Sequence, residues 1–351
     1  MGTACPRRQG LPAARRAQTI HSRPLLSSCT AVLLAAALAV SACGGDDDGP
    51  FTPRGTLRVI VFGDMPYVEP DTPARDSLLE RYAAVLETIA AESASFVVHV
   101  GDMTGLTCSD SLFLERRREL DALPHPVIFT PGDNDWLDCP PETYNRYERL
   151  AKLRELFAAG NRSLGRRRLS LERQSAQPRY AAFRENARWR AGDVMFLTVH
   201  VVGSNNGRGL GAAPHPEYVE RNAANLAWLR ESFAEARRAD LRGVVIIMHA
   251  NPIEGPPPDR PDAINGLIET RDEIRTLAAE FGRPVALVHG DTHEFRVDRP
   301  LRDAQGNMLT NLVRAETYGW PHMHAMIMMV DPAAPELFTF EPLIVRGNAL
   351  D

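Results

Sequence analysis

Short apolar runs alternate with longer amphipathic stretches along most of this 351-residue chain. Each run has the length of a buried strand, and the stretches between the runs have helical spacing. The predicted strands are residues 57–62, 96–100, 127–130, 194–202, 244–248 and 285–288. A strand-then-helix rhythm predicts strands covered by helices on both faces, and therefore a single α/β domain.

The stretches between the strands are predicted to be helices at residues 76–92, 111–122, 141–159, 216–238 and 263–281. After His293 the pattern changes to shorter β-like pieces. These pieces are residues 295–297, 309–315, 325–330 and 337–340, and we expect them to form hairpins in a second sheet. Residues 161–179 are rich in arginine and serine, which indicates a surface insertion.

The first 42 residues have the pattern of an export signal. Arginines precede an apolar run at residues 30–40, which is too short to span a bilayer comfortably, and small residues follow. The tetrapeptide Val40-Ser41-Ala42-Cys43 resembles a bacterial lipobox, which implies a lipid on Cys43 and a lipid-anchored protein on the periplasmic or extracellular face of a bacterial membrane. An uncleaved anchor and an ordinary signal peptide are the alternatives.

Residues 43–55 are rich in glycine, aspartate and proline, and we predict that they form a flexible tether. The folded domain is then expected at residues 56–345. Two cysteines remain in it, Cys108 and Cys139. An exported chain most simply pairs two such cysteines in a disulfide, and two free buried thiols are the alternative.

The charge balance argues against a nucleic-acid partner. Acidic residues outnumber basic ones by 45 to 40, and five of the arginines lie in the predicted leader, where there is no acidic residue. The rest of the chain is therefore clearly acidic and should not favour a phosphate backbone.

Acidic residues and histidines stand directly after the predicted strands. They are Asp64, Asp102, Asp133 with Asn134 and Asp135, His249, and Asp291 with His293. Ligands of open α/β sheets bind outside the carboxyl ends of the strands, so these side chains are expected to converge on one rim. Carboxylates gathered so closely need a cation, because their charges otherwise force protonation. The pattern therefore predicts a metal centre.

The same residues carry a family resemblance. The motifs are GD (63–64), GD (101–102), PGDND (131–135), HANP (249–252) and GDTH (290–293). In this order they resemble the motifs of the calcineurin-like metallophosphoesterases, which include the purple acid phosphatases. The resemblance covers about residues 56–300. It implies a β-sandwich flanked by helices in four αββα layers, and hydrolysis of a small-molecule phosphoester by a hydroxide that bridges two divalent ions.

The resemblance also implies a role for each residue. Asp64 and His293 match ligands of the first ion, and Asp102 matches the carboxylate that bridges both ions. Asp133, His249 and Asp291 match the ligands of the second ion. Asn134 stands where the family has a histidine that assists the transition state or leaving group, and Asp135 would be the partner of that group.

Three departures from the family pattern affect the chemistry. Pro66 replaces a histidine ligand, so Tyr67 or water would have to complete the first ion's coordination. Four carboxylates balance the charge of two divalent ions, which moves the preference from Zn²⁺ toward Mn²⁺, Mg²⁺ or iron. Asn134 can donate a hydrogen bond but cannot deliver a proton. Arg296, close after GDTH, is a further candidate for stabilising developing charge.

Two main functions therefore remain open from the sequence, beside a weaker third one, a different metal-dependent hydrolase that uses the same rim. The first is an exported metal-dependent phosphoesterase. The second is a catalytically weakened or inactive surface module that binds a metal or another ligand on the same fold. The six potential ligands favour the enzyme, whereas the substitutions at Pro66 and Asn134 favour the module.

Overall fold

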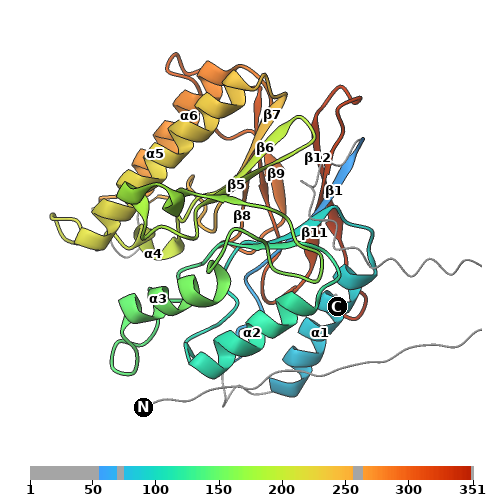
Figure 1. The fold of residues 1–351 in the computed structure, drawn as a ribbon, viewed down its shortest axis with the longest axis vertical. Coiled ribbons are helices and arrows are strands. Elements are labelled where there is room, and N and C mark those ends of the chain that lie inside the picture. Colours follow the sequence, from blue (N-terminus) through green and yellow to red (C-terminus); the bar gives the residue numbers. More distant parts are fainter. Residues whose placement is uncertain (1–54, 69–74, 256–263, 349–351) are drawn as a thin grey trace, which may run out of the picture. The chain divides into compact units, whose positions relative to one another are not determined.

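Two β-sheets pack face to face, and helices cover their outer faces, in the computed structural model (Figure 1). The structure describes residues 55–68, 75–255 and 264–348. The predicted leader and nearly all of the predicted tether lie outside these ranges. None of the helices in the described ranges has the length and apolar character needed to cross a membrane.

The first sheet has five strands, and three of them are the first three predicted from the sequence. Its order is β12 (Phe338–Leu343), β11 (Ala325–Val330), β1 (Leu57–Phe62), β2 (Phe96–His99) and β3 (Val127–Phe129). The neighbours β1, β2 and β3 are parallel, whereas β11 runs antiparallel to β1 and to β12. The carboxyl ends of β1, β2 and β3 therefore lie at one edge of this sheet.

The second sheet has seven strands. Its order is β4 (Glu172–Arg173), β5 (Ala187–Ala191), β6 (Val194–Thr198), β7 (Gly243–Ile247), β8 (Val285–His289), β10 (Leu312–Glu316) and β9 (Arg296–Asp298). The neighbours β6, β7, β8 and β10 are parallel. They supply the second group of carboxyl ends.

Helices lie on the outer face of each sheet (Figure 1). The five-stranded sheet is covered by α1 (Arg75–Ala91), α2 (Asp110–Ala122) and α3 (Arg146–Phe157), and the seven-stranded sheet by α5 (Pro216–Arg238) and α6 (Ile268–Phe281). The single turn α4 (Gly203–Asn206) and two 3₁₀ turns, η1 (Gln174–Ala176) and η2 (Pro178–Tyr180), complete the elements.

Side chains alternate between the layers along each buried strand, as the two-residue period of a strand requires. In β1, Ile60 and Phe62 pack toward the helices, whereas Val59 and Val61 pack between the two sheets. Strands buried on both faces read as continuous apolar runs, which is why they could be found in the sequence. The predicted α/β fold, a β-sandwich flanked by helices in four layers, is confirmed.

The C-terminal pieces form two antiparallel pairs, as predicted, but the prediction that both lie in the second sheet was wrong. β9 and β10 join the seven-stranded sheet, whereas β11 and β12 extend the five-stranded one. The residues of β11 explain its place. Met326 and Met328 pack between the sheets, while Ala325 and Ile327 face the helices, so the strand needs cover on both faces beside β1.

Two further differences have local causes. β5 was missed because arginines alternate with Trp189 in the segment ARWRA, which does not read as an apolar run. Helix α3 begins at Arg146, later than predicted, because the side chain of Asn145 accepts hydrogen bonds from the backbone N–H groups of Tyr147 and Glu148.

A disulfide joins Cys108 and Cys139, as predicted, with their Cα atoms 6.0 Å apart. Both cysteines are buried in the core beneath the outer helices. The sulfur of Cys108 lies 3.5 Å from the backbone carbonyl oxygen of Asn134, so the bridge is packed against the loop that carries PGDND.

Replacing both Cys108 and Cys139 with alanine is expected to lower the free energy of unfolding by about 3–4 kcal/mol, because the bridge closes a loop across 31 positions of sequence. Urea denaturation measures the change. Dithiothreitol should lower the wild-type midpoint and leave that of the double variant unchanged. Equal wild-type midpoints with and without dithiothreitol would contradict the stabilising role.

Candidate metal centre

The residues predicted to bind metal meet where the carboxyl ends of strands from both sheets face one another. Asp64, Asp102 and Asp133 follow β1, β2 and β3 of the first sheet, whereas His249 follows β7 and Asp291 follows β8 of the second. The two sheets therefore contribute to one site. All of these side chains except that of Asp291 are buried.

Two groups of possible ligand atoms share His249. One consists of Asp64, Asp102 and His249, and the other of Asp133, His249 and Asp291, with the atoms of each group within 4.8 Å of one another. The second group is the set that the sequence assigned to the second ion. In each group, two carboxylates and an imidazole are donors that suit a divalent cation such as Mn²⁺ or Fe²⁺.

His249 is oriented as a metal ligand would be. Its Nδ1 donates a hydrogen bond to the backbone carbonyl of Val100 at 2.9 Å, which leaves Nε2 to face the carboxylates. Nε2 lies 2.9 Å from an oxygen of Asp133 and 3.5 Å from oxygens of Asp102 and Asp291. None of these oxygens is aligned to form a hydrogen bond with it. A buried nitrogen without an aligned partner among three carboxylates fits a cation.

His293 has the same second contact but lies at the rim. Its Nδ1 donates to the backbone carbonyl of Trp320 at 2.8 Å, and its Nε2 lies 3.6 Å from an oxygen of Asp64. The hydroxyl of Tyr67 lies 3.2 Å from the same Nε2 and donates to Asp102 at 2.8 Å. Tyr67 thus stands between two residues assigned to the first ion.

Without an ion, the pKa values of two carboxyl groups in the site are raised. Burial raises the pKa of Asp64 to about 8, and neighbouring carboxylates add to the rise although the charge of His249 opposes it. Burial also raises the pKa of Asp102 well above its usual range. Moreover, one oxygen of Asp64 is buried without a hydrogen-bond partner. A bound cation would provide the positive charge that these groups otherwise obtain from protons.

Unusual backbone conformations are concentrated in this site. Asp64, Tyr67, Asp102, Asp291 and His293 all have positive φ angles, between 49° and 76°. Side chains other than glycine rarely adopt this region, and such strain is characteristic of functional sites that the surrounding fold holds in place.

A loop after β6 also contacts the site. Gly203 donates its backbone N–H to an oxygen of Asp133 at 3.1 Å. A Cβ atom at Gly203 would lie 2.5 Å from an oxygen of Asp291 and 2.6 Å from one of Asp133. The next residues, Ser204, Asn205 and Asn206, form a left-handed turn that holds this close approach. The apolar run before the loop indicated only a strand end.

Asp135 has a different partner from the one expected. Its carboxylate accepts hydrogen bonds from the backbone N–H groups of Gly132, Asp102 and Met103, at 2.8 to 2.9 Å. It therefore joins the loops after β2 and β3 to each other. The backbone N–H of Asn134 donates to Asp102 at 3.0 Å, which places Asn134 at the edge of the site.

Arg296 and Glu254 lie near the site in different ways. Arg296 begins β9, and its guanidinium forms an ion pair with Glu294. Glu254, in the loop after His249, was not considered from the sequence. Burial raises its pKa to about 7, and the nearby charges of Asp291 and Glu316 contribute to the rise.

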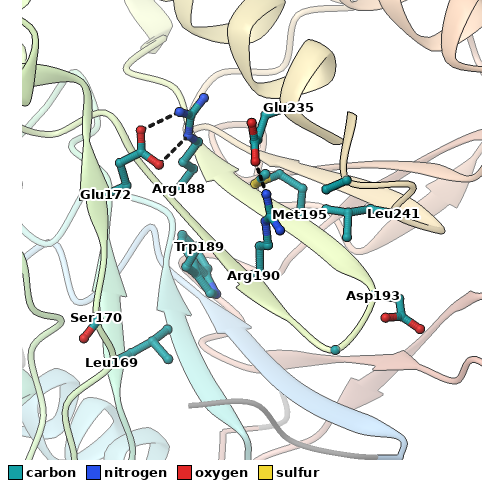
Figure 2. Close-up of a pocket in the computed structure, with 12 residues that line it drawn as sticks. Leu169, Ser170, Glu172, Arg188, Trp189, Arg190, Asp193, Met195, Glu235 and Leu241 are labelled. Atoms are coloured by element: carbon teal, nitrogen blue, oxygen red, sulfur yellow. Dashed lines mark hydrogen bonds and ion pairs between the residues drawn. The ribbon is translucent and has the colours of Figure 1, made fainter. Parts of the chain in front are cut away.

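A pocket of about 570 Å³ lies at the other edge of the seven-stranded sheet, on the hairpin of β5 and β6. Figure 2 shows that its two central arginines are already paired, Arg188 with Glu172 and Arg190 with Glu235. Both arginines of this pocket are neutralised by glutamates, whereas no arginine or lysine is seen to pair with the carboxylates of the candidate metal centre in the described residues. We therefore place the candidate site at the rim.

Comparisons with known proteins do not assign a function to this chain. No model of a known family matches the chain, and no curated protein matches it. The chain is similar to a solved structure named "Putative 5'-Nucleotidase from Staphylococcus aureus in complex with alpha-ketoglutarate", with 12% identity and a TM-score of 0.45 over 82% of this chain and 53% of that one. It is also similar to TT1561 of Thermus thermophilus, with 12% identity and a TM-score of 0.47 over 83% of this chain and all of that one.

The chain thus spans about half the length of the first of these proteins. At such TM-scores the similarity carries no argument about activity. The predicted resemblance to the metallophosphoesterases agrees with the structure at the level of the fold, through the two sheets and the motif residues at their strand ends.

Replacing Gly203 with alanine is expected to weaken Mn²⁺ binding by about 10- to 100-fold, because its Cβ would displace the carboxylates of Asp133 and Asp291. Isothermal titration calorimetry measures the affinity. Gly211→Ala is the matched control, since the nearest atom to a Cβ there is a carbonyl oxygen 3.9 Å away. Equal Mn²⁺ affinity in both variants would contradict the close packing at Gly203.

Proposed function

We propose that this protein is an exported, lipid-anchored metal-dependent phosphoesterase. The observation that carries the proposal is the placement of His249, whose Nε2 faces carboxylates from both sheets without an aligned hydrogen-bond partner. Two divalent ions bound there would lower the pKa of a water molecule and neutralise charge on a phosphoryl group. The substrate would be a small phosphoester.

The residues of the chain would divide the work as follows. Asp64, Asp102 and His293 would hold the first ion, and Asp133, His249 and Asp291 the second. Asp102, whose carboxylate lies 3.5 Å from Nε2 of His249, is proposed to bridge the two ions. Val100 and Trp320 fix the two histidines through their backbone carbonyls. This second contact orients a histidine ligand and increases its basicity.

Asn134 and Asp135 would act in different ways. Asn134 lies at the edge of the site, where its amide could donate a hydrogen bond to a phosphoryl oxygen as charge develops. Asp135 is proposed as a positioning residue, because its carboxylate binds the backbone of the loops that carry Asp102 and Asp133. It would act by holding those ligands in place.

Tyr67 is proposed to complete the coordination of the first ion, in place of the histidine that Pro66 removes. Its hydroxyl oxygen lies within hydrogen-bonding distance of both Asp102 and His293. Without an ion, burial and the charges of Asp102 and Asp64 raise the pKa of Tyr67 well above its usual value. A cation at the position would favour the phenolate instead.

Export and anchoring are proposed from the sequence of residues 1–43. The order of arginines, an apolar run and a lipobox-like tetrapeptide supports a lipid on Cys43 in the bacterial cell envelope. The disulfide between Cys108 and Cys139 is consistent with an oxidising compartment.

Asp102→Asn is expected to reduce phosphoesterase activity by at least about 100-fold, because it removes charge shared by both ions. The measurement is hydrolysis of p-nitrophenyl phosphate and bis-p-nitrophenyl phosphate with Mn²⁺, Fe²⁺, Mg²⁺ or Zn²⁺. Asp272→Asn, on helix α6 away from the site, is the matched control and should keep full activity. Metal binding without hydrolysis of either ester under any ion would favour the alternative, an inactive binding module.

Tyr67→Phe is expected to abolish a visible charge-transfer absorption band that the Fe³⁺-loaded wild-type protein should show if the phenolate is a ligand. Absorption spectroscopy at matched iron content measures the band, and Tyr147→Phe, at an exposed position on α3, is the control. A spectrum that is identical in the wild type and in Tyr67→Phe would show that Tyr67 only donates a hydrogen bond to Asp102.

A further inference from the structure

A cleft of about 590 Å³ opens beside the candidate metal centre. It is lined by the segment that contains His293 and by the segment after β10, and its aromatic residues are Phe295, Tyr318 and Trp320. His293 lines the cleft and also faces Asp64. His293 therefore belongs both to the cleft and to the candidate metal centre.

The backbone at Trp320 is fixed to the candidate ligands. Its N–H donates to the carbonyl of Asp64 at 2.8 Å, and its own carbonyl accepts from Nδ1 of His293 at 2.8 Å. Gly319 permits this approach, because a Cβ there would lie 2.6 Å from Cβ of Asp64 and 2.8 Å from the ring of His293. The position of residue 320 thus follows the geometry of the metal centre.

The side chain of Trp320 is nevertheless 43% exposed. A large aromatic group that is held rigidly at its backbone and left open to solvent beside a reaction site is suited to stack against a ligand. The opposite part of the cleft is also aromatic. The rings of Phe295 and Tyr318 stack on each other with their centroids 5.2 Å apart and their planes at 11°, so the pair adds apolar, aromatic surface to the cleft.

The cleft gives a second anionic group little to bind. Among the described residues that line it there is no lysine or arginine, and it includes the carboxylate of Glu294, which pairs with Arg296. Burial raises the pKa of Tyr318, so its hydroxyl remains a neutral group. The cleft is suited to an uncharged planar group.

We infer that this cleft binds a planar aromatic group on the ester side of the substrate, with Trp320 as the residue that determines specificity. The inference rests on the proposed phosphoesterase function and names its substrate class. The aromatic group could be an aryl ring joined directly to the phosphoester or a nucleobase joined through a sugar, since both present a flat face for stacking.

The experiment compares binding of three phosphonates to the Mn²⁺-loaded protein by calorimetry: methylphosphonate, phenylphosphonate and the phosphonate analogue of adenosine 5′-monophosphate. Phosphonates are chosen because they are not esters that the protein could cleave. At least one aromatic ligand is expected to bind about tenfold more tightly than methylphosphonate, the gain typical of one stacked ring. The ligand with the larger gain identifies aryl ring or nucleobase as the preferred group.

Trp320→Ala should lower the ratio of aromatic-ligand affinity to methylphosphonate affinity to about one, whereas Trp320→Phe should retain most of that ratio. Met308→Ala, at another exposed apolar side chain outside the cleft, is the matched control. Equal affinity for methylphosphonate and both aromatic ligands, or a gain that survives in Trp320→Ala, would overturn the inference and leave the phosphoesterase proposal intact. Failure of all three ligands to bind would instead contradict the proposed function.

Discussion

The repulsion among buried carboxylates around His249 is the constraint on which the rest of this structure depends. Asp64, Asp102 and Asp133 are buried at the ends of three neighbouring strands, and the pKa of Asp64 rises to about 8 when no cation is present. Folding these groups together costs free energy that apolar packing must offset. A bound cation would supply the positive charge that offsets this cost. Nε2 of His249 is directed into the cluster, where it could bind such a cation.

The two-sheet architecture makes this cluster possible. Each sheet ends its parallel strands at the same rim, and the apolar layer between the sheets fixes the separation of those ends. The turns that follow the strands adopt strained positive φ angles, and hydrogen bonds from Asp135 join two of them. Backbone carbonyls orient the histidines in turn. The rigidity of the core is therefore transmitted to individual ligand atoms through a few short, directed contacts.

Much of this arrangement could be predicted from the sequence. Strands that are buried on both faces appear as continuous apolar runs, and the acidic motifs stand directly after those runs. The structure gathers five of the six predicted ligands into two groups that share His249, and places Nε2 of the sixth, His293, 3.6 Å from an oxygen of Asp64. The rest depended on contacts between distant segments. Three features could not be predicted because no local sequence pattern reports them. They are the contact of Gly203 with Asp133, the three hydrogen bonds from backbone groups to Asp135, and the pairing of β11 with β1. The arginine-rich strand β5 was missed because its charged side chains conceal the period of the strand.

The most direct test of the central claim is the anomalous scattering of Mn²⁺ in crystals of the protein soaked with that ion. We predict two peaks near Nε2 of His249, one beside Asp64 and Asp102 and the other beside Asp133 and Asp291. The absence of any peak at these residues, with His249 protonated and hydrogen-bonded to the carboxylates, would contradict the claim that the cluster is a metal centre.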